Sequence, residues 1–433
     1  MSSPYKTVAL HTFGCKANFA DTSLLGSTFS EIGYNIVPFS SIADIYVINT
    51  CSVTDNANKK CRSLIRNLKK RVPHAIVGVT GCYAQLKPQE IIDIPEVNFV
   101  VGMHEKYNFI DKIENITNED KFLFHSNDIQ AVEDAFLSYS LDERTRSFVK
   151  IQDGCDYICS YCTIPMARGK SRSPKISKIL DHICTLQEAN IKEIILSGIN
   201  VGDFGQGNGE TFIELLKEIN SKTSIPRIRI SSIEPNLITD DIIDFIAVNE
   251  KFMPHLHIPL QSGSDHILRK MRRRYNVKSY VDKISRVKDK IENCTIGVDI
   301  MTGFPGETEE DFSNTYDLLS DLPISYLHVF PFSERENTGA DSMKNKVSLD
   351  IRYARAKILR KLSNIKFQEV QKNNINKIKS VLFELNEDGF ISGLTDNYIR
   401  VKVEEPNILK TNFISDVKLL KTDGEVMLGE IVL

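Results

Sequence analysis

The chain has 433 residues, which at about 150 residues per domain predicts roughly three domains. Lys and Arg number 54 against 57 Asp and Glu, and 41% of the residues are hydrophobic, so the composition is that of a folded chain and excludes a disordered or collagen-like protein. No apolar run approaches the roughly 18 residues of a membrane span and no secretory leader is visible, so we expect a cytoplasmic protein without a membrane partner.

Short apolar strands alternate with helical patterns in the amino-terminal part of the chain. Strands are expected at 8–14, 44–50 and 75–81, and helices near 19–32 and 55–71, an alternation typical of a parallel βα sheet. A cysteine follows each strand directly; the three are Cys15, Cys51 and Cys82. Because the carboxyl ends of parallel strands meet at one edge of a sheet, we expect these thiols to converge. The alternative is three small, buried residues at strand ends.

The middle of the chain repeats this alternation after a polar, acidic segment at 111–147, which we expect to be a linker. Six more short strands are expected at 147–152, 193–198, 227–232, 255–260, 295–303 and 326–332. With helical spacers between them, they predict a partial (β/α)6 barrel whose functional residues lie at the carboxyl ends of the strands. The candidates at these ends are Gly198, Asn200, Ser231, Glu234, Gln261, Asp299 and Arg335.

The last part of the chain has a different character. A long polar helix is expected over about 348–374, followed by short strands that Gly, Asn and Asp separate. This pattern predicts a small antiparallel β-barrel or sandwich. From residue 373 on, seven Lys and Arg face ten Asp and Glu, and a net charge of −3 is unfavourable for binding RNA.

The segment GCDYICSYC places Cys155, Cys159 and Cys162 in a C-x3-C-x2-C spacing just after the first barrel strand. Cysteine thiolates hold iron–sulfur clusters, and three ligands leave one iron of a four-iron cubane open to a substrate or cofactor. A zinc site would need a fourth ligand, and no nearby His or Cys supplies one. In a reducing compartment, nine cysteines indicate metal or thiol chemistry rather than a disulfide framework.

Four segments concentrate positive charge although the whole chain is slightly acidic. Residues 59–71 hold seven cations and no acid, and the other clusters lie at 168–172, 269–274 and 352–361. A single such cluster is ordinarily a solvated helix face. Four of them favour an anionic partner bound locally, and nucleic acid is the main candidate.

The motifs HTFGCK, INTCSVT, TGCYAQ, IQDGCDYICSYCTIPMARGKSRS and GFPGET together resemble the radical S-adenosylmethionine (SAM) methylthiotransferase family. The resemblance covers essentially the whole chain and is strongest to the branch that acts on N6-threonylcarbamoyladenosine in tRNA. It implies an α/β fold with a parallel βα methylthiotransferase domain (4–118), a partial (β/α)6 radical SAM core (141–371) and a small TRAM-like β-barrel (374–433).

The resemblance also implies cofactors, partners and residue roles. Cys155, Cys159 and Cys162 would hold a [4Fe–4S] cluster that chelates and cleaves SAM, and Cys15, Cys51 and Cys82 would hold an auxiliary [4Fe–4S] cluster. The seven strand-end residues named above would contact SAM. The partners would be the anticodon stem-loop of tRNA and a reducing electron donor, with no DNA partner.

The substrate of this branch carries a carboxylate, and an arginine suits it best because its donors bind a carboxylate in a bidentate manner. Arg168 is our first candidate, ahead of Arg172 and Arg335, with a phosphate contact or SAM's carboxylate as its alternative role. The alternatives for the whole chain are the same chemistry on isopentenyladenosine or on a ribosomal-protein aspartate, and a non-catalytic iron–sulfur or zinc protein that binds nucleic acid.

Some residues are expected to be structural. Cys184 and Cys294 lie in apolar contexts and are predicted to be core residues, whereas Cys61 lies on the basic helix. His255 and His257 alternate on one strand, and packing is the expected role of both.

Overall fold

The computed structural model describes residues 7–52, 55–113, 116–125, 129, 138–139, 145–387, 389–404 and 411–432. The chain forms two compact units, each described here by itself. The first comprises Met1–Ser140, Phe148–Pro174 and Ser333–Asp341, and the second comprises Leu141–Ser147, Lys175–Phe332 and Ser342–Leu433. None of the described helices is both long and apolar enough to cross a membrane.

The first unit is built on a six-stranded, all-parallel sheet with the order β2-β1-β3-β4-β5-β6. The strands are β1 (Thr7–Thr12), β2 (Asn35–Val37), β3 (Ile45–Thr50), β4 (Ile76–Gly81), β5 (Phe99–Val101) and β6 (Phe122–Phe124). The helices are α1 (Lys16–Glu31), α2 (Asp55–Arg71), α3 (Cys82–Leu86), α4 (Pro88–Ile92) and the 3-10 helix η1 (Ile110–Ile113). This confirms the predicted parallel βα sheet.

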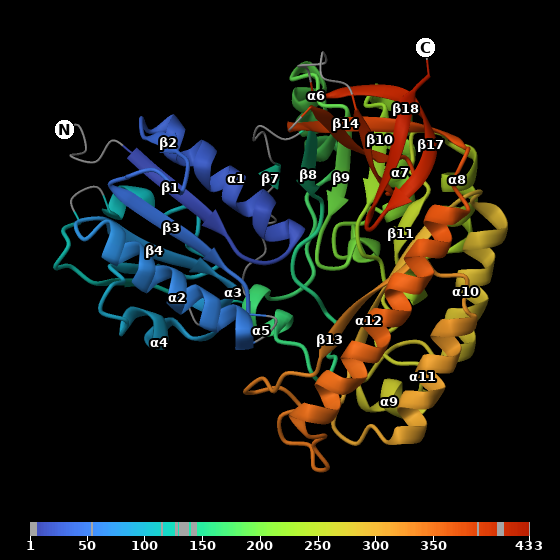
Figure 1. Ribbon diagram of the computed structural model, residues 1–433. Coiled ribbons are helices and arrows are strands. Elements are labelled where there is room, and N and C mark those ends of the chain that lie inside the picture. Colours follow the sequence, from blue (N-terminus) through green and yellow to red (C-terminus); the bar gives the residue numbers. More distant parts are fainter. Residues whose placement is uncertain are drawn as a thin grey trace. The chain divides into compact units, whose positions relative to one another are not determined.

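Helices cover both faces of this sheet, which is why β3 and β4 are buried along their whole length. Leu25 and Phe29 of α1 pack with Val47 on one face. Ile65 and Leu68 of α2 pack on the other, in the same core as α3 and α4. Figure 1 shows α1 and α2 on opposite sides of the blue strands.

The expectation of a linker over 111–147 is wrong for several described residues. Phe122–Phe124 forms β6 and pairs with β5, and β7 (Ser138–Tyr139) pairs antiparallel with the end of β8 (Arg146–Lys150). These residues form strands because their backbones hydrogen-bond to a neighbouring strand, although the segment around them is polar. Residues 114–115, 126–128, 130–137 and 140–144 of that segment lie outside the described residues.

The second unit contains the remaining barrel strands in parallel pairs. They are β9 (Glu193–Ser197), β10 (Arg227–Ile230), β11 (His255–His257), β12 (Thr295–Thr302) and β13 (Tyr326–Pro331). The intervening helices are α6 (Ile176–Glu188), η3 (Val201–Asp203), α7 (Phe212–Lys222), η4 (Pro235–Leu237), α8 (Asp240–Val248), α9 (Asp265–Lys270), α10 (Val277–Lys290) and α11 (Glu309–Asp321). Together with β8 these are the six predicted strands.

The long helix α12 (Leu349–Lys372) leads into the closed barrel that was expected at the end of the chain. Its order is β14-β15-β16-β18-β17, from β14 (Ile378–Glu387), β15 (Phe390–Thr395), β16 (Arg400–Glu404), β17 (Phe413–Asp423) and β18 (Val426–Ile431). Figure 1 shows this barrel in red at the end of the orange α12. Arg227 donates to the carbonyls of Leu394 and Thr395, so the small barrel contacts the amino-terminal start of β10.

Candidate functional site

Three loops at the carboxyl edge of the first unit's sheet carry Cys15, Cys51 and Cys82. Cys15 precedes α1, Cys51 follows β3, and Cys82 is the first residue of α3. A Cβ at Gly14, whose φ is +106°, would lie 2.6 Å from the Cβ and 3.0 Å from the Sγ of Cys51. Glycine is therefore required for the first loop to approach the second so closely. A Cβ at Gly81, directly before Cys82, would lie 2.4 Å from the carbonyl oxygen of Thr50, directly before Cys51, so the three loops meet as expected.

The loop with Cys155, Cys159 and Cys162 runs from β8 to the short helix α5 (Ile164–Arg168) in the same unit. Its two ends are joined by a pair of backbone hydrogen bonds, of 3.0 and 2.9 Å, between Asp153 and Arg172. The backbone N–H of Tyr157 donates to the Sγ of Cys155 at 3.4 Å, and that of Ile164 to the Sγ of Cys162 at 3.4 Å. Such N–H···S bonds stabilise thiolates and tune iron–sulfur clusters.

The donor set of both cysteine groups fits iron–sulfur clusters. All six cysteines are free thiols, and none is engaged in a disulfide. Within the described part of the chain, no group of three or more His, Cys, Asp or Glu lies close enough to hold a single metal ion. A cubane does not require such closeness, because each of its cysteines binds a different iron atom.

A network of buried charges lies beside these loops. Asp21 of α1 accepts from Lys150, from Lys106 Nζ at 3.1 Å and from Arg168 Nη2 at 3.2 Å. Asp153 accepts from Arg168 Nη1 at 2.7 Å and from Lys150 Nζ at 3.3 Å. Every one of these five side chains is at most 5% exposed.

The network keeps its two carboxylates ionised. Burial alone would raise the pKa of Asp21, but Lys106, Lys150 and Arg168 hold it well below its usual range. Arg168 and Lys150 likewise lower the pKa of Asp153 against the effect of burial. Asp21 was not among the functional residues predicted from the sequence. The sequence pattern that could have revealed Asp21 is a polar face on α1, because Asn18, Asp21 and Thr22 follow one another at helical spacing.

The structure gives Arg168 other partners than the expected substrate carboxylate. Its side chain is fully buried, and two carboxylates of the protein already occupy its guanidinium. Arg172, the second candidate, donates to the carbonyl of Arg168 at 2.6 Å and pairs with Asp153 at 3.3 Å.

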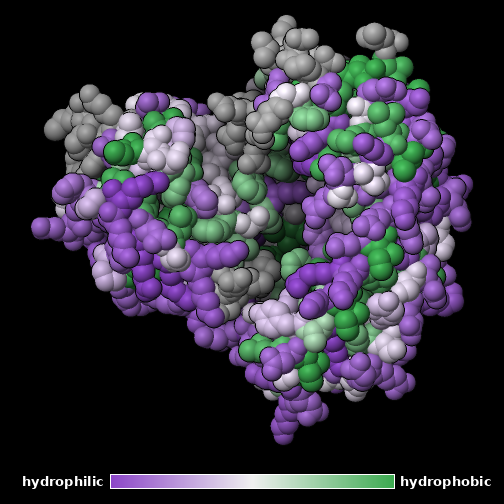
Figure 2. Space-filling view, viewed as in Figure 1, coloured by the Kyte–Doolittle hydropathy of each residue, from purple (hydrophilic) through white to green (hydrophobic). Residues whose placement is uncertain are grey.

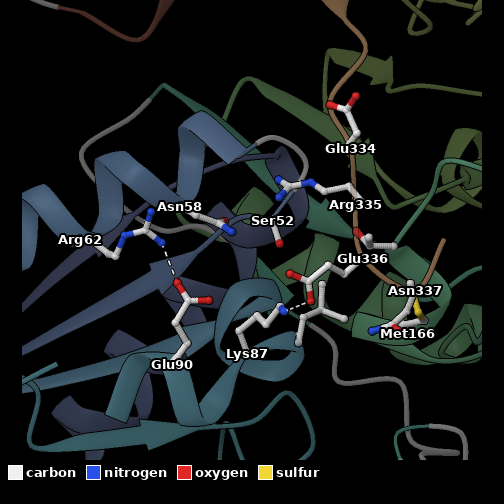
Figure 3. A pocket seen from close by; sticks show the side chains of 12 residues that line it. Ser52, Asn58, Arg62, Lys87, Glu90, Met166, Glu334, Arg335, Glu336 and Asn337 are labelled. Carbon is white, nitrogen blue, oxygen red and sulfur yellow. Dashed lines mark hydrogen bonds and ion pairs between the residues drawn. The ribbon is translucent and has the colours of Figure 1, made fainter. Parts of the chain in front are cut away.

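Arg335, the third candidate, lines a cavity of about 300 Å³ in the first unit (Figure 3). The guanidinium of Arg335 extends toward Ser52 and Asn58, whereas Glu334 points away (Figure 3). Ser52 directly follows Cys51, and Thr163 directly follows Cys162, so residues adjacent to both cysteine groups border the cavity. The full lining is Ser52, Asn58, Arg62, Leu86, Lys87, Glu90, Thr163, Met166, Glu334, Arg335, Glu336 and Asn337.

Ion pairs already engage two other cations of this cavity. Arg62 Nη1 lies 2.8 Å from Glu90 Oε1, and Lys87 pairs with Glu336. Arg62 also donates to the hydroxyl of Tyr83 at 2.6 Å, which in turn donates to Glu90 at 2.5 Å.

The basic helix α2 also presents a shallow groove of about 320 Å³. Its lining is strongly cationic and consists of Lys59, Arg62, Ser63, Arg66, Asn67 and Lys70. Figure 2 shows the face of the first unit around α2 as predominantly hydrophilic.

The other six strand-end candidates lie in the second unit, where the structure brings some of them together. The backbone N–H of Glu234 donates to Asn200 Oδ1 at 3.4 Å. The backbone N–H of Gln261 donates to the carbonyl of Asp299 at 2.8 Å. Glu234 forms an ion pair with Arg273. Ser231 is buried, and Gly198 directly follows β9.

The structure confirms only some of the positions predicted to be structural. His255 is buried, hydrogen-bonds to the Tyr326 hydroxyl at 2.7 Å and stacks on Tyr398, so packing is its role. Cys294 is buried as expected, but the prediction of a core position for Cys184 is wrong, because that residue is on the outer face of α6. Cys61 is buried, and burial raises the pKa of its thiol to about 12.

Comparisons with known proteins agree with this architecture. The model of "Uncharacterized protein family UPF0004" matches residues 7–102, and that of the radical SAM superfamily matches residues 149–319. Threonylcarbamoyladenosine tRNA methylthiotransferase MtaB of Bacillus subtilis is 37% identical, covering 98% of this chain and 96% of that protein. tRNA-2-methylthio-N(6)-dimethylallyladenosine synthase of Clostridium tetani is 33% identical, with coverages of 98% and 96%.

Among solved structures, the radical SAM methyltransferase TsrM of Kitasatospora setae, with cobalamin and a [4Fe-4S] cluster bound, is similar with a TM-score of 0.55. It is 13% identical and the match covers 79% of this chain and 77% of that one, which shows a shared fold.

Proposed function

Because the chain belongs to the MtaB-type branch of the radical SAM methylthiotransferase family, we propose that it methylthiolates carbon 2 of N6-threonylcarbamoyladenosine at position 37 of tRNA. The observation that carries the proposal is the cavity in Figure 3, which residues adjacent to both cysteine groups border. An enzyme that joins sulfur from one cluster to a carbon activated at another needs such a shared space.

We assign the cofactors by cysteine group. Cys155, Cys159 and Cys162 would hold the [4Fe–4S] cluster that binds SAM, and Cys15, Cys51 and Cys82 the auxiliary [4Fe–4S] cluster. When bound, the two clusters and SAM supply the hydrogen abstraction at an unactivated carbon and the methylthio group. We propose that the strand-end residues of the second unit contact SAM. We also propose that the chain divides into domains at 4–118, 141–371 and 374–433.

The chain's own residues hold and enclose these groups. The N–H groups of Tyr157 and Ile164 orient the sulfurs of Cys155 and Cys162. The ion pairs of Arg62 and Lys87 fix the walls of the cavity. We place the target nucleotide in this cavity and the phosphates of the anticodon stem-loop along α2, whose groove is cationic. We further propose that an external donor supplies the electrons and that the protein acts in the cytoplasm, where tRNA is modified.

The test uses reconstituted enzyme and anticodon stem-loop RNA with or without the threonylcarbamoyl group. Nucleoside mass spectrometry should show the 2-methylthio product only with the threonylcarbamoyl substrate. Iron analysis should give roughly eight irons per chain, as two cubanes require. Equal turnover of RNA without the group, or turnover of isopentenyladenosine or of a ribosomal-protein aspartate instead, would overturn the substrate assignment. Stoichiometric zinc without iron would overturn the enzyme class.

A further inference from the structure

Asn58 places an unpaired polar atom beside the cavity of Figure 3. The residue lies on the first turn of α2, lines the cavity and is only 7% exposed. Its Oδ1 is buried and has no hydrogen-bond partner among the residues that the structure describes. A buried acceptor without a donor costs free energy, so an N–H group of a bound ligand would stabilise this oxygen.

Other polar side chains of the same cavity are already held by the protein. Arg62 pairs with Glu90, and Lys87 pairs with Glu336. In the described part of the chain, no hydrogen bond holds Asn58 Oδ1 in this way. Rotation about the last side-chain bond of an asparagine has broad, roughly two-fold minima, so the carboxamide can turn its oxygen toward a ligand in the cavity.

Arg335 supplies a cation next to this carboxamide. Its guanidinium extends toward Asn58 and Ser52 (Figure 3). In a threonylcarbamoyl group, a ureido N–H and the carboxylate are attached to the same carbon atom, so a site that binds both needs an acceptor beside a cation. Asn58 beside Arg335 has this composition. An isopentenyl group offers neither the N–H nor the carboxylate.

We propose that Asn58 determines the specificity for the threonylcarbamoyl group, because its Oδ1 accepts a hydrogen bond from the ureido N–H next to the threonyl carbon. The proposal rests on the proposed function and deepens it by naming a substrate contact. With isopentenyladenosine in the cavity, Oδ1 would stay buried and unpaired. A site that hydrogen-bonds one substrate rejects an analogue without the matching group much more strongly than apolar contacts alone can.

The test compares kcat/KM of the reconstituted holoenzyme on two anticodon stem-loop RNAs. One RNA carries the threonylcarbamoyl group, and in the other an oxygen atom replaces the ureido N–H while the carboxylate is kept. The wild type should turn over the oxygen analogue about tenfold more slowly or less, because the analogue turns a second acceptor toward Oδ1. Asn58→Leu, which cannot accept a hydrogen bond, should lose about tenfold with the natural group and should turn over both RNAs at similar rates.

Asn337→Gly is the matched control, because Asn337 lines the same cavity but is exposed, and glycine adopts its φ of +64° without strain. This variant should keep the wild-type ratio between the two RNAs. An Asn58→Leu enzyme that discriminates as strongly as the wild type would overturn the proposal. So would a wild type that turns over the two RNAs equally, and this result needs no variant to fold. A wild type that acts on isopentenyladenosine as well as on the threonylcarbamoyl substrate would instead overturn the proposed function.

Discussion

At the scale of single residues, position relative to the cavity distinguishes the three candidate arginines, because Arg335 lines the cavity and Arg168 and Arg172 do not. Arg168 and Arg172 both carry positive charge near the cysteine loop, yet both already bind Asp153. Arg335 lies on a loop of the first unit, and it lines the cavity that residues adjacent to both cysteine groups border (Figure 3). We therefore predict that Arg335, which lines the cavity, contacts the carboxylate of the proposed substrate.

We predict that Arg335→Gln lowers turnover of threonylcarbamoyl-modified RNA about ten- to a hundredfold. A hydrogen-bonded contact to a charged group contributes about 1.5–3 kcal/mol, which corresponds to that range. The sharper measurement uses RNA in which the threonyl carboxylate is a methyl ester. The ester should be a poor substrate for the wild type, whereas Arg335→Gln should turn over both RNAs at similar rates.

Asn337→Ala is a suitable control, because Asn337 lines the same cavity without a charge. It should preserve the preference for the free carboxylate. An Arg335→Gln enzyme that still discriminates against the ester as strongly as the wild type would show that another group reads the carboxylate.

The six cysteines allow a second prediction, on the division of work between the clusters. Cys159→Ala should abolish SAM cleavage, because two cysteines would not hold the cluster whose open iron binds SAM. Cys51→Ala should retain 5′-deoxyadenosine formation but give no methylthio product. Chromatography of both products from the same reaction measures the two outcomes.

Iron content and one more variant control this experiment. Cys159→Ala and Cys51→Ala should each keep about four irons per chain. Cys184→Ser changes an exposed cysteine outside both groups and should behave as the wild type. Loss of SAM cleavage in both cluster variants, with the second cluster intact in each, would refute the assignment of roles.

At the scale of elements, α2 is a cationic helix whose apolar face is fixed in the core by Ile65 and Leu68. Its exposed cations include Lys59, Arg66 and Lys70. We predict that replacing these three by Gln weakens tRNA binding without changing the preference among tRNAs. The slope of log affinity against log salt should fall by about one for each lost phosphate contact.

Arg400→Gln with Lys402→Gln is the matched comparison, because these two cations lie on β16 of the acidic terminal barrel. Titrations over a range of salt concentrations should give a smaller change for this pair than for the α2 variant. The opposite ranking would mean that the terminal barrel, rather than α2, carries most of the phosphate contacts.

Most elements were predictable because their signals are local. The strands before Cys15, Cys51 and Cys82 and the helix at Asp55–Arg71 follow from short-range hydrophobic periodicity. β6 was not predictable, because its exposed Phe122 and Leu123 are joined to β5 by backbone pairing that leaves no pattern in the sequence. The partners of Asp21 were hidden for a similar reason, since Lys106 and Lys150 lie 85 and 129 residues away along the chain.

At the scale of the whole molecule, the compact units do not follow the order of the chain. Residues 148–174, which the sequence analysis assigns to the radical SAM core, belong to the same unit as the amino-terminal sheet. Buried ion pairs from Lys150 and Arg168 to Asp21 explain this grouping, because separating them would expose or unpair several charges at once. Both cysteine groups are therefore carried by one body.

In the second unit, a buried glutamate joins the barrel strands to the terminal barrel. Glu193 pairs with Arg227 at 2.9 Å and Arg229 at 3.0 Å, and both arginines also donate to backbone carbonyls between Leu394 and Asp396. Burial would raise the pKa of Glu193, but these arginines, with Arg146, lower it to about 2. The ionised carboxylate thus holds the two arginines in the orientation that the terminal barrel requires.

We predict that this contact makes stability depend on pH in a defined direction. An unfolded glutamate has a pKa of about 4.3, so the stabilisation by Glu193 is complete above that pH and is lost as the pH falls toward about 2. Glu193→Gln should therefore be less stable than the wild type at pH 7, and urea unfolding should show this difference shrinking between about pH 4.3 and 2. Comparing the two proteins at each pH removes the effect of acid on the clusters, which both share. Glu430→Gln, in a surface pair with Lys418 whose N–O distance is 3.9 Å, should show little difference at any pH. A Glu193→Gln deficit that stays constant down to pH 2 would mean that packing around the side chain, rather than its charge, joins the two parts of this unit.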